Sequence, residues 1–219
     1  MTGQFQLPPG FDLGAVFLFA LTGAWAAIRR NYDFVGVFTL ALVTGAGGSL
    51  LRDVVFIQHE HPAVMEDARY IWAVLAASVF AALTFPLAQR SDQLVAAVDA
   101  LALGVYAVVG AQKALTTGLS PTDAIIVGVV NATGGGLIRD VLVREEPLFF
   151  KPGQYYVLAA LGGTSLFTLL LLYGQMPVQH AAWLSIGGTL LFRMLAIRFN
   201  WRTSPMPHWG ARSPPQNHD

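Results

Sequence analysis

The sequence predicts an all-α membrane protein with seven transmembrane helices, arranged as two inverted three-helix repeats plus a seventh helix. Three observations carry this prediction. Of the 219 residues, 54% are hydrophobic and only 12% are charged, about half the charged fraction of an ordinary soluble domain. Seven apolar stretches approach the length of about 20 residues that a helix needs to cross a bilayer. A glycine-rich motif also occurs twice, 87 residues apart.

Short connections that carry charges or helix breakers separate the seven predicted spans. The spans are Phe11–Ile28, Phe34–Ile57, Tyr70–Ala88, Leu94–Leu115, Ala124–Val143, Tyr155–Tyr173 and Ala181–Ile197. We therefore expect a single transmembrane domain over residues 1–219. Repeat one covers about 11–89, repeat two about 94–173 and the seventh helix about 180–198. A tail over about 203–219, rich in proline and polar residues, is predicted to be disordered.

The distribution of basic residues predicts the orientation. Met1–Gly10 contains no Lys or Arg, whereas Arg29 and Arg30 follow the first span, which favours an uncleaved helix over a signal peptide. Ten Lys and Arg residues fall on the side of the C-terminus and three, Arg52, Arg69 and Lys113, on the side of the N-terminus. Because positive residues accumulate on the cytoplasmic side, we expect the N-terminus outside and the C-terminus in the cytoplasm.

The repeat is visible in several separate matches. Gly47–Asp53, with the sequence GGSLLRD, returns as Gly134–Asp140, with the sequence GGGLIRD, and the same offset relates Asp12 to Asp99. Each copy holds three predicted spans, an odd number, so the second copy is expected to insert upside down. Inverted repeats recur in transport proteins, with the pathway at the repeat interface. Duplication for stability alone is the alternative.

The repeated glycines lie within the second and fifth spans. Each glycine costs a helix roughly 1 kcal/mol relative to alanine, and the clusters predict breaks in both helices. Carbonyl groups exposed at such breaks can replace water around a cation. Close packing of small residues between helices is the alternative. The candidate pore residues are Gly45, Gly47, Gly48, Gly134, Gly135 and Gly136.

Two Arg-Asp dipeptides follow the glycines, in or near the apolar zone, where charged residues usually serve function. They are Arg52-Asp53 and Arg139-Asp140. Adjacent helical residues point about 100° apart, so we do not expect either arginine to pair with its neighbour. We expect the symmetry-related pairs Asp12–Arg52 and Asp99–Arg139 instead. Snorkelling of these charges to the lipid headgroups is the alternative.

Lys113 departs from the repeat, because Ala26 occupies the matching position. It lies near the outer end of the fourth span. Snorkelling to the membrane surface is one interpretation, and a role in gating or in the pathway is the other.

Other classes of function are not supported. The chain contains no Cys, which excludes thiolate metal sites and Cys nucleophiles, and a net charge of +0 gives no basic field for nucleic acid. No group of Ser, His or carboxylate residues in the spans has an arrangement typical of a catalytic site, so we expect neither an enzyme nor a cofactor. His59-Glu60-His61 has no third ligand nearby, and we expect no metal site there.

From about Asp12 to Arg198 the chain resembles the trimeric intracellular cation channels and their bacterial relatives. The resemblance rests on the duplicated glycine-rich stretch with Arg-Asp, the paired Asp12 and Asp99, and the seven-span plan. It implies a homotrimer in the bacterial inner membrane, in contact with lipid. Each protomer would conduct monovalent cations, chiefly K⁺, through its own pore between the second and fifth spans, kinked at the glycines.

The resemblance also leaves a second function open. Animal members carry a Lys-Glu pair where this chain has Arg52-Asp53, and some bacterial relatives look like transporters of glycine or similar small amino acids. A K⁺-permeable channel is the leading hypothesis. A secondary transporter of a small zwitterion is the alternative, and a membrane scaffold that transports nothing is the third.

Overall fold

The structure is a computed structural model that describes residues 7–57, 62–151 and 155–201. Within those ranges it contains helices and no strand. The elements in chain order are α1 (Pro9–Ile28), α2 (Phe34–Leu51), the π-helical segment η1 (Arg52–Ile57), α3 (Ala63–Glu66), α4 (Ala68–Arg90), α5 (Asp92–Thr116), α6 (Pro121–Leu142), α7 (Tyr156–Leu172) and α8 (Val178–Arg198).

Each predicted span corresponds to a helix in this structure. Six segments in the described residues are long and apolar enough to cross a membrane, with α2 and η1 acting together as one of them. The sixth predicted span forms α7, which is apolar but has only 17 residues. The tail predicted over 203–219 lies outside the described residues, as does His59-Glu60-His61.

Side-chain caps define where several helices begin. Asp33 precedes α2 and accepts a hydrogen bond from the Gly36 amide, and Ser91 precedes α5 and accepts one from the Leu94 amide. Ser120 and Asp123 form a reciprocal capping box at the start of α6. Such caps satisfy amide groups that have no partner within the helix.

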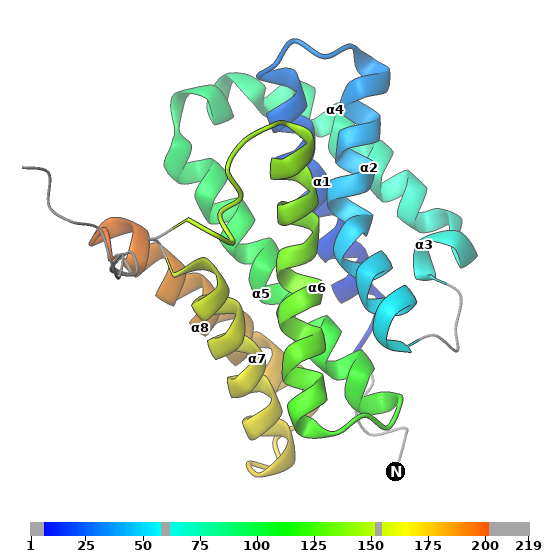
Figure 1. The fold of residues 1–219 in the computed structure, drawn as a ribbon, viewed down its shortest axis with the longest axis vertical. Helices are drawn as coiled ribbons and strands as arrows, with labels where there is room; N and C mark the ends of the chain where they lie inside the picture. The colour runs from blue at the N-terminus through cyan, green and yellow to red at the C-terminus, as the bar shows by residue number, and fades with distance from the viewer. Residues whose placement is uncertain (1–6, 58–61, 152–154, 202–219) are drawn as a thin grey trace, which may run out of the picture.

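The centre of the molecule is formed by α1, α2, α5 and α6, which contact one another. α4 packs against α1, whereas α7 and α8 pack against α5. α2 and α6 lie side by side and run in opposite directions (Figure 1). α5 is the most buried of the candidate spans in the described chain, and α4 the least.

The glycines of α2 and α6 allow the two backbones to touch. A Cβ atom on Gly48 would lie closer than 3.0 Å to the carbonyl oxygen of Asn131, and one on Gly135 equally close to the carbonyl oxygen of Thr44. Both helices nevertheless remain α-helical through their glycine clusters. The predicted breaks at the glycines are therefore wrong, because an intact helix satisfies its own backbone and the missing side chains are used for packing.

Contacts across this crossing recur with the offset of the sequence repeat. Adding 87 to Gly48 and subtracting 87 from Asn131 gives Gly135 and Thr44, the partners in the second contact. Phe19 and Tyr106 are also related by this offset, and they stack on each other with ring centroids 5.2 Å apart. Residues that the sequence repeat relates to each other therefore meet where the two copies pack together.

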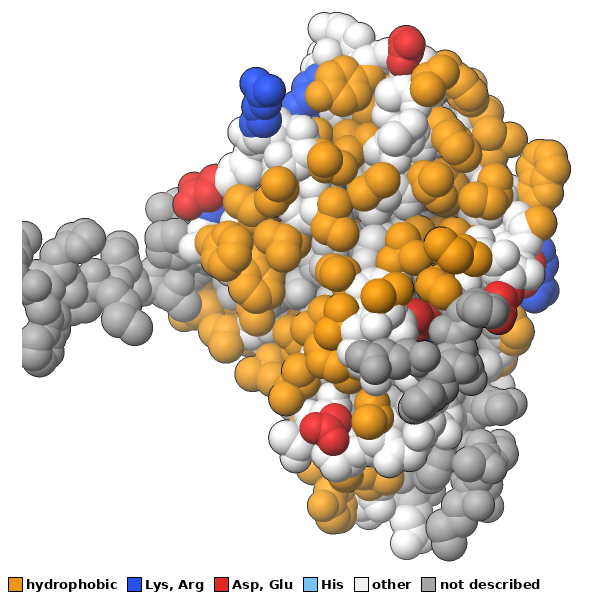
Figure 2. Space-filling model, turned by 45° about the vertical axis from the view of Figure 1, so that its right-hand side comes forward, with side chains coloured by type: hydrophobic (Ala, Val, Ile, Leu, Met, Phe, Trp, Pro, Cys, Tyr) orange, Lys and Arg blue, Asp and Glu red, His pale blue; other side chains and the backbone are white. Residues whose placement is uncertain are grey.

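The outer surface is apolar to an extent that a soluble protein rarely shows. Hydrophobic side chains cover much of the face shown in Figure 2, and several large ones are well exposed, including Leu83 at 75% and Trp72 at 67%. With the six apolar spans, this surface identifies a membrane protein.

Candidate functional site

The second repeat holds a buried charge cluster around Arg139. Its Nη1 donates to Asp99 Oδ1 at 3.1 Å and to the Thr22 hydroxyl at 2.9 Å. Arg139 comes from α6, Asp99 from α5 and Thr22 from α1, so the guanidinium joins three helices. The predicted Asp99–Arg139 pair is confirmed. Asp99 is 4% exposed and Arg139 8% exposed, so neither charge snorkels to a headgroup.

Arg139 also binds its sequence neighbour Asp140, a pair that we did not expect from the 100° between adjacent helical residues. Its Nε donates to Asp140 Oδ1 at 2.9 Å. That expectation was wrong because the arginine stem is long enough to turn back along the helix surface. The other oxygen of Asp140 accepts the Leu148 amide at 3.2 Å, which fixes the loop after α6.

The first repeat builds a similar cluster from its own Arg-Asp dipeptide. Arg52 Nε donates to Asp53 Oδ1 at 2.6 Å, and Arg52 Nη2 donates to Asp53 Oδ2 at 3.1 Å. Both residues are buried, and they lie in η1, where the α-helix gives way to a π-helix. Asp53 Oδ2 also accepts the Ala63 amide at 3.4 Å, which parallels the contact between Asp140 and Leu148.

Lys113 adds a third charge to this cluster. Its Nζ lies 3.2 Å from Asp53 Oδ1, and its side chain is 21% exposed. The ammonium therefore turns inward to a carboxylate, contrary to the interpretation that it snorkels to the surface. Lys113 belongs to the second repeat, and the matching position in the first repeat is Ala26, so the two clusters are chemically unequal.

The predicted pair between Asp12 and Arg52 does not form. Asp12 Oδ2 instead accepts a hydrogen bond from the Tyr70 hydroxyl at 2.6 Å, and no ion pair joins Asp12 to Arg52 in the part of the chain that the structure describes. The bidentate contact with Asp53 already occupies two nitrogens of Arg52. Asp12 Oδ1 and Arg52 Nη1 remain buried without a hydrogen-bond partner.

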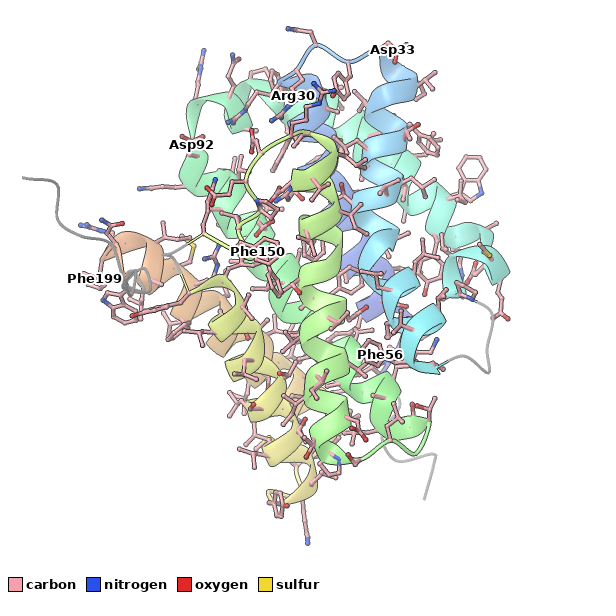
Figure 3. All side chains as sticks on the ribbon, in the orientation of Figure 1. Arg30, Asp33, Phe56, Asp92, Phe150 and Phe199 are labelled. Atoms are coloured by element: carbon pink, nitrogen blue, oxygen red, sulfur yellow. The ribbon has the colours of Figure 1, made fainter. Side chains whose placement is uncertain are left out.

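A cavity of about 290 Å³ opens beside the second cluster. It lies at the end of the molecule where Figure 3 places Arg30 and Asp92, opposite the end that holds Phe56. Thr22, Asp99 and Arg139 line its buried part, whereas Arg29–Asp92 and Arg30–Glu145 ion pairs lie at its exposed rim.

The charges that line this cavity balance. Four arginines are matched by four carboxylates, all of them in the described part of the chain: Arg29, Arg30, Arg139, Arg193, Asp92, Asp99, Asp140 and Glu145. The guanidinium of Arg193 lies over the Tyr156 ring, 4.9 Å from its centroid. The formal charges of the residues that line the cavity therefore cancel.

Several residues of this site were not anticipated. Thr22, Tyr70 and Arg193 carry no repeat signature, and only the packing of helices brings them to the charges. Tyr106 did leave a signal, because Asp99, Tyr106 and Lys113 follow one another at intervals of seven residues. Seven residues are close to two helical turns, so this spacing places all three on one face of α5.

The comparison with known proteins connects this geometry to a family. A family model described as a glycine transporter matches the chain twice, over residues 10–86 and 96–172. The chain belongs to this family. The glycine transporter family model therefore recurs along the chain, once on each side of the α4–α5 connection.

Relatives of this glycine transporter family member are bacterial membrane proteins. A UPF0126 membrane protein of Deinococcus radiodurans is 32% identical over 198 residues, which cover 89% of each chain. The UPF0126 inner membrane protein YadS of Escherichia coli is 30% identical over 193 residues, covering 86% of this chain and 91% of YadS.

Solved structures extend the comparison to channels. A TRIC trimeric intracellular cation channel orthologue from Rhodobacter sphaeroides is 33% identical, with a TM-score of 0.78, over 86% of this chain and 96% of that one. A structure described in terms of conductance through TRIC cation channels is 26% identical, with a TM-score of 0.79, over 92% of this chain and 98% of that one. This member of the glycine transporter family therefore has the fold of TRIC channels.

Proposed function

We propose that the protein conducts monovalent cations, chiefly K⁺, through a pathway inside each protomer of a homotrimer. The observation that carries the proposal is the neutralisation of Arg139 by two carboxylates, Asp99 and Asp140, beside a polar cavity. A lone buried arginine would repel a cation at this depth. Two carboxylates offset that charge and leave the cluster attractive to cations.

The pathway runs between the two repeats, which we infer to be inverted copies. The helices α1, α2, α5 and α6 form the centre of the molecule, and α5 contributes a residue to each cluster. Transport proteins built from inverted repeats commonly place their pathway at this interface. Here the glycines bring the backbones of α2 and α6 into contact at the interface between the repeats.

Two further features of the proposal come from relatives. The Rhodobacter sphaeroides orthologue is described as a trimeric cation channel and shares 33% identity with this chain. At this identity and coverage we extend both cation conduction and trimeric assembly to this protein. The Escherichia coli relative is named an inner membrane protein, and we propose the same location here.

A small zwitterion carrier is the second candidate function. The cavity presents guanidinium and carboxylate groups within one neutral lining, which suits the carboxylate and ammonium of an amino acid. The description of the family model as a glycine transporter favours the same substrate class.

One pair of measurements separates the two candidates. Purified protein in a planar bilayer under a K⁺ gradient should give unitary current steps that reverse toward the K⁺ equilibrium potential. A carrier should instead give no unitary steps and should show saturable glycine counterflow in liposomes. Arg139→Gln should change either activity, whereas Arg90→Gln, at an exposed residue that ends α4 and does not line the cavity, is the matched control. Silence in both assays from folded protein would overturn both candidates.

A further inference from the structure

Tyr106 occupies the position midway between the two charge clusters. Asp99 and Lys113 lie seven residues before and after it on α5, a separation of about 10.5 Å along the helix axis in each direction. Asp99 belongs to the Arg139 cluster and Lys113 to the Arg52–Asp53 cluster. A solute that passes from one cluster to the other along this face of α5 must therefore pass Tyr106.

The contacts of Tyr106 reach all four central helices. Its hydroxyl donates to the carbonyl oxygen of Gly45 in α2, and its ring stacks on Phe19 in α1. Its own carbonyl accepts a hydrogen bond at 2.7 Å from Asn131 Nδ2 in α6. The side chain is 0% exposed, and Tyr106 is not among the residues that line the cavity at the Arg139 end.

We propose that Tyr106 is the plug that closes the pathway between the two clusters, and that its hydrogen bond to Gly45 holds the closed state. This inference rests on the proposed conduction. The repeat supports a specific role for the hydroxyl, because the equivalent residue is Phe19, which has none. The two rings stack on each other, yet only Tyr106 has a hydroxyl, and this hydroxyl donates to the Gly45 carbonyl in α2.

The hydrogen bond from the Tyr106 hydroxyl to Gly45 acts on α2, the helix that carries the first glycine cluster. Gly45 packs against α1, where a Cβ atom would lie 2.9 Å from the Val16 carbonyl oxygen. Through Gly45 the hydroxyl of Tyr106 ties α5 to the tight α1–α2 contact. For the pathway to open, Tyr106 must release this carbonyl and its ring must leave the stack on Phe19. Removing the hydroxyl should therefore favour the open state, and removing the ring should favour it more.

Two variants test the plug. Tyr106→Phe keeps the ring and removes one hydrogen bond, which should raise the open population and K⁺ flux roughly two- to tenfold. Tyr106→Ala removes the ring and should raise flux further, and it should also admit larger cations such as N-methyl-D-glucamine. Phe167→Ala is the matched control, because Phe167 is a fully buried aromatic residue of α7 outside both charge clusters.

The flux of K⁺ from liposomes should be measured for all four proteins after each is shown to be folded by its elution volume and thermal transition. Higher flux in both Tyr106 variants with no change in Phe167→Ala supports the plug. If the wild-type protein conducts K⁺ and neither Tyr106→Phe nor Tyr106→Ala changes the flux, the plug is overturned and the channel proposal is retained. Equal gains in Phe167→Ala and Tyr106→Ala also overturn the plug, because general loosening would explain them. Silence in every folded protein overturns the channel itself. If Tyr106→Ala does not fold, the comparison of Tyr106→Phe with wild type decides.

Discussion

Asp99 Oδ1 and Arg139 Nη1 lie 3.1 Å apart, joining α5 to α6 across 40 residues of sequence. Arg139 also donates hydrogen bonds to Asp140 and Thr22, so one guanidinium binds three groups in the described chain. Because the cluster is buried, the removal of one carboxylate leaves the positive charge incompletely compensated in a medium of low dielectric constant. This relationship makes the cluster a sensitive point for both stability and conduction.

We first predict that Asp99→Asn destabilises the protein by about 1–3 kcal/mol, since Arg139 keeps Asp140 but loses its partner on α5. Thermal unfolding in detergent would measure the loss, and a double-mutant cycle with Arg139→Gln should show coupling. The control is Asp92→Asn, whose side chain is 92% exposed and which should change stability by less than about 1 kcal/mol. Additive effects in the cycle would contradict the pairing.

The second prediction concerns the backbone contact between α2 and α6. Gly48→Ala would place a Cβ atom against the Asn131 carbonyl oxygen, so it should cost about 1–3 kcal/mol through overpacking. Gly135→Ala should behave in the same way against Thr44. The thermal transition measures both.

Gly162→Ala in α7 provides the control for these glycines, because a Cβ atom there would meet nothing within 4 Å. That substitution should leave stability unchanged or raise it by up to about 1 kcal/mol through better helix propensity. If all three alanine variants unfold alike, the close contact does not explain the glycines.

Third, Tyr70→Phe should destabilise the Asp12 end of the first repeat. The substitution removes the 2.6 Å hydrogen bond to Asp12 Oδ2, and Oδ1 already has no partner. A partly buried carboxylate that loses a charge-assisted hydrogen bond should cost about 1–3 kcal/mol. Tyr173→Phe, at a residue that is 77% exposed, should have no measurable effect on unfolding.

Fourth, the positive residues predict an orientation that cysteine labelling can test, since the chain has no Cys of its own. Thr117→Cys, in the loop after α5, should react with an impermeant maleimide on intact spheroplasts. Gln93→Cys, at the start of α5, should react only after the membrane is permeabilised. Both side chains are exposed. The reverse pattern would place the N-terminus in the cytoplasm.

Much of the fold follows from local patterns. The seven spans were recognisable because a helix that crosses a bilayer needs a long run of apolar residues, and such runs are visible directly in the sequence. The repeat was recognisable because its glycines and charges return at one offset. The Asp99–Arg139 pair followed from that symmetry once both residues were placed at the same end of their helices.

The errors in the site have two causes. The broken helices and the separation of Arg52 from Asp53 were inferred from helix geometry considered one segment at a time, whereas the Asp12–Arg52 pair was inferred from the repeat symmetry. The structure shows intact helices at the glycines and Arg52 bound to its neighbour in a π-helix. Neither result can be read from spacing, because each depends on which atoms of other helices lie within reach.

By itself, the sequence determined that this is a membrane protein, how its spans are divided and where its repeated glycines and charges fall, because burial in lipid constrains every residue of a span. The tertiary structure alone decided that α2 and α6 touch through Gly48 and Gly135, that Lys113 turns to Asp53, and that the Tyr106 hydroxyl bonds the Gly45 carbonyl. These outcomes depend on helix packing. The energies of contacts between segments far apart in the chain depend on how the helices pack, and the local sequence pattern does not predict that packing.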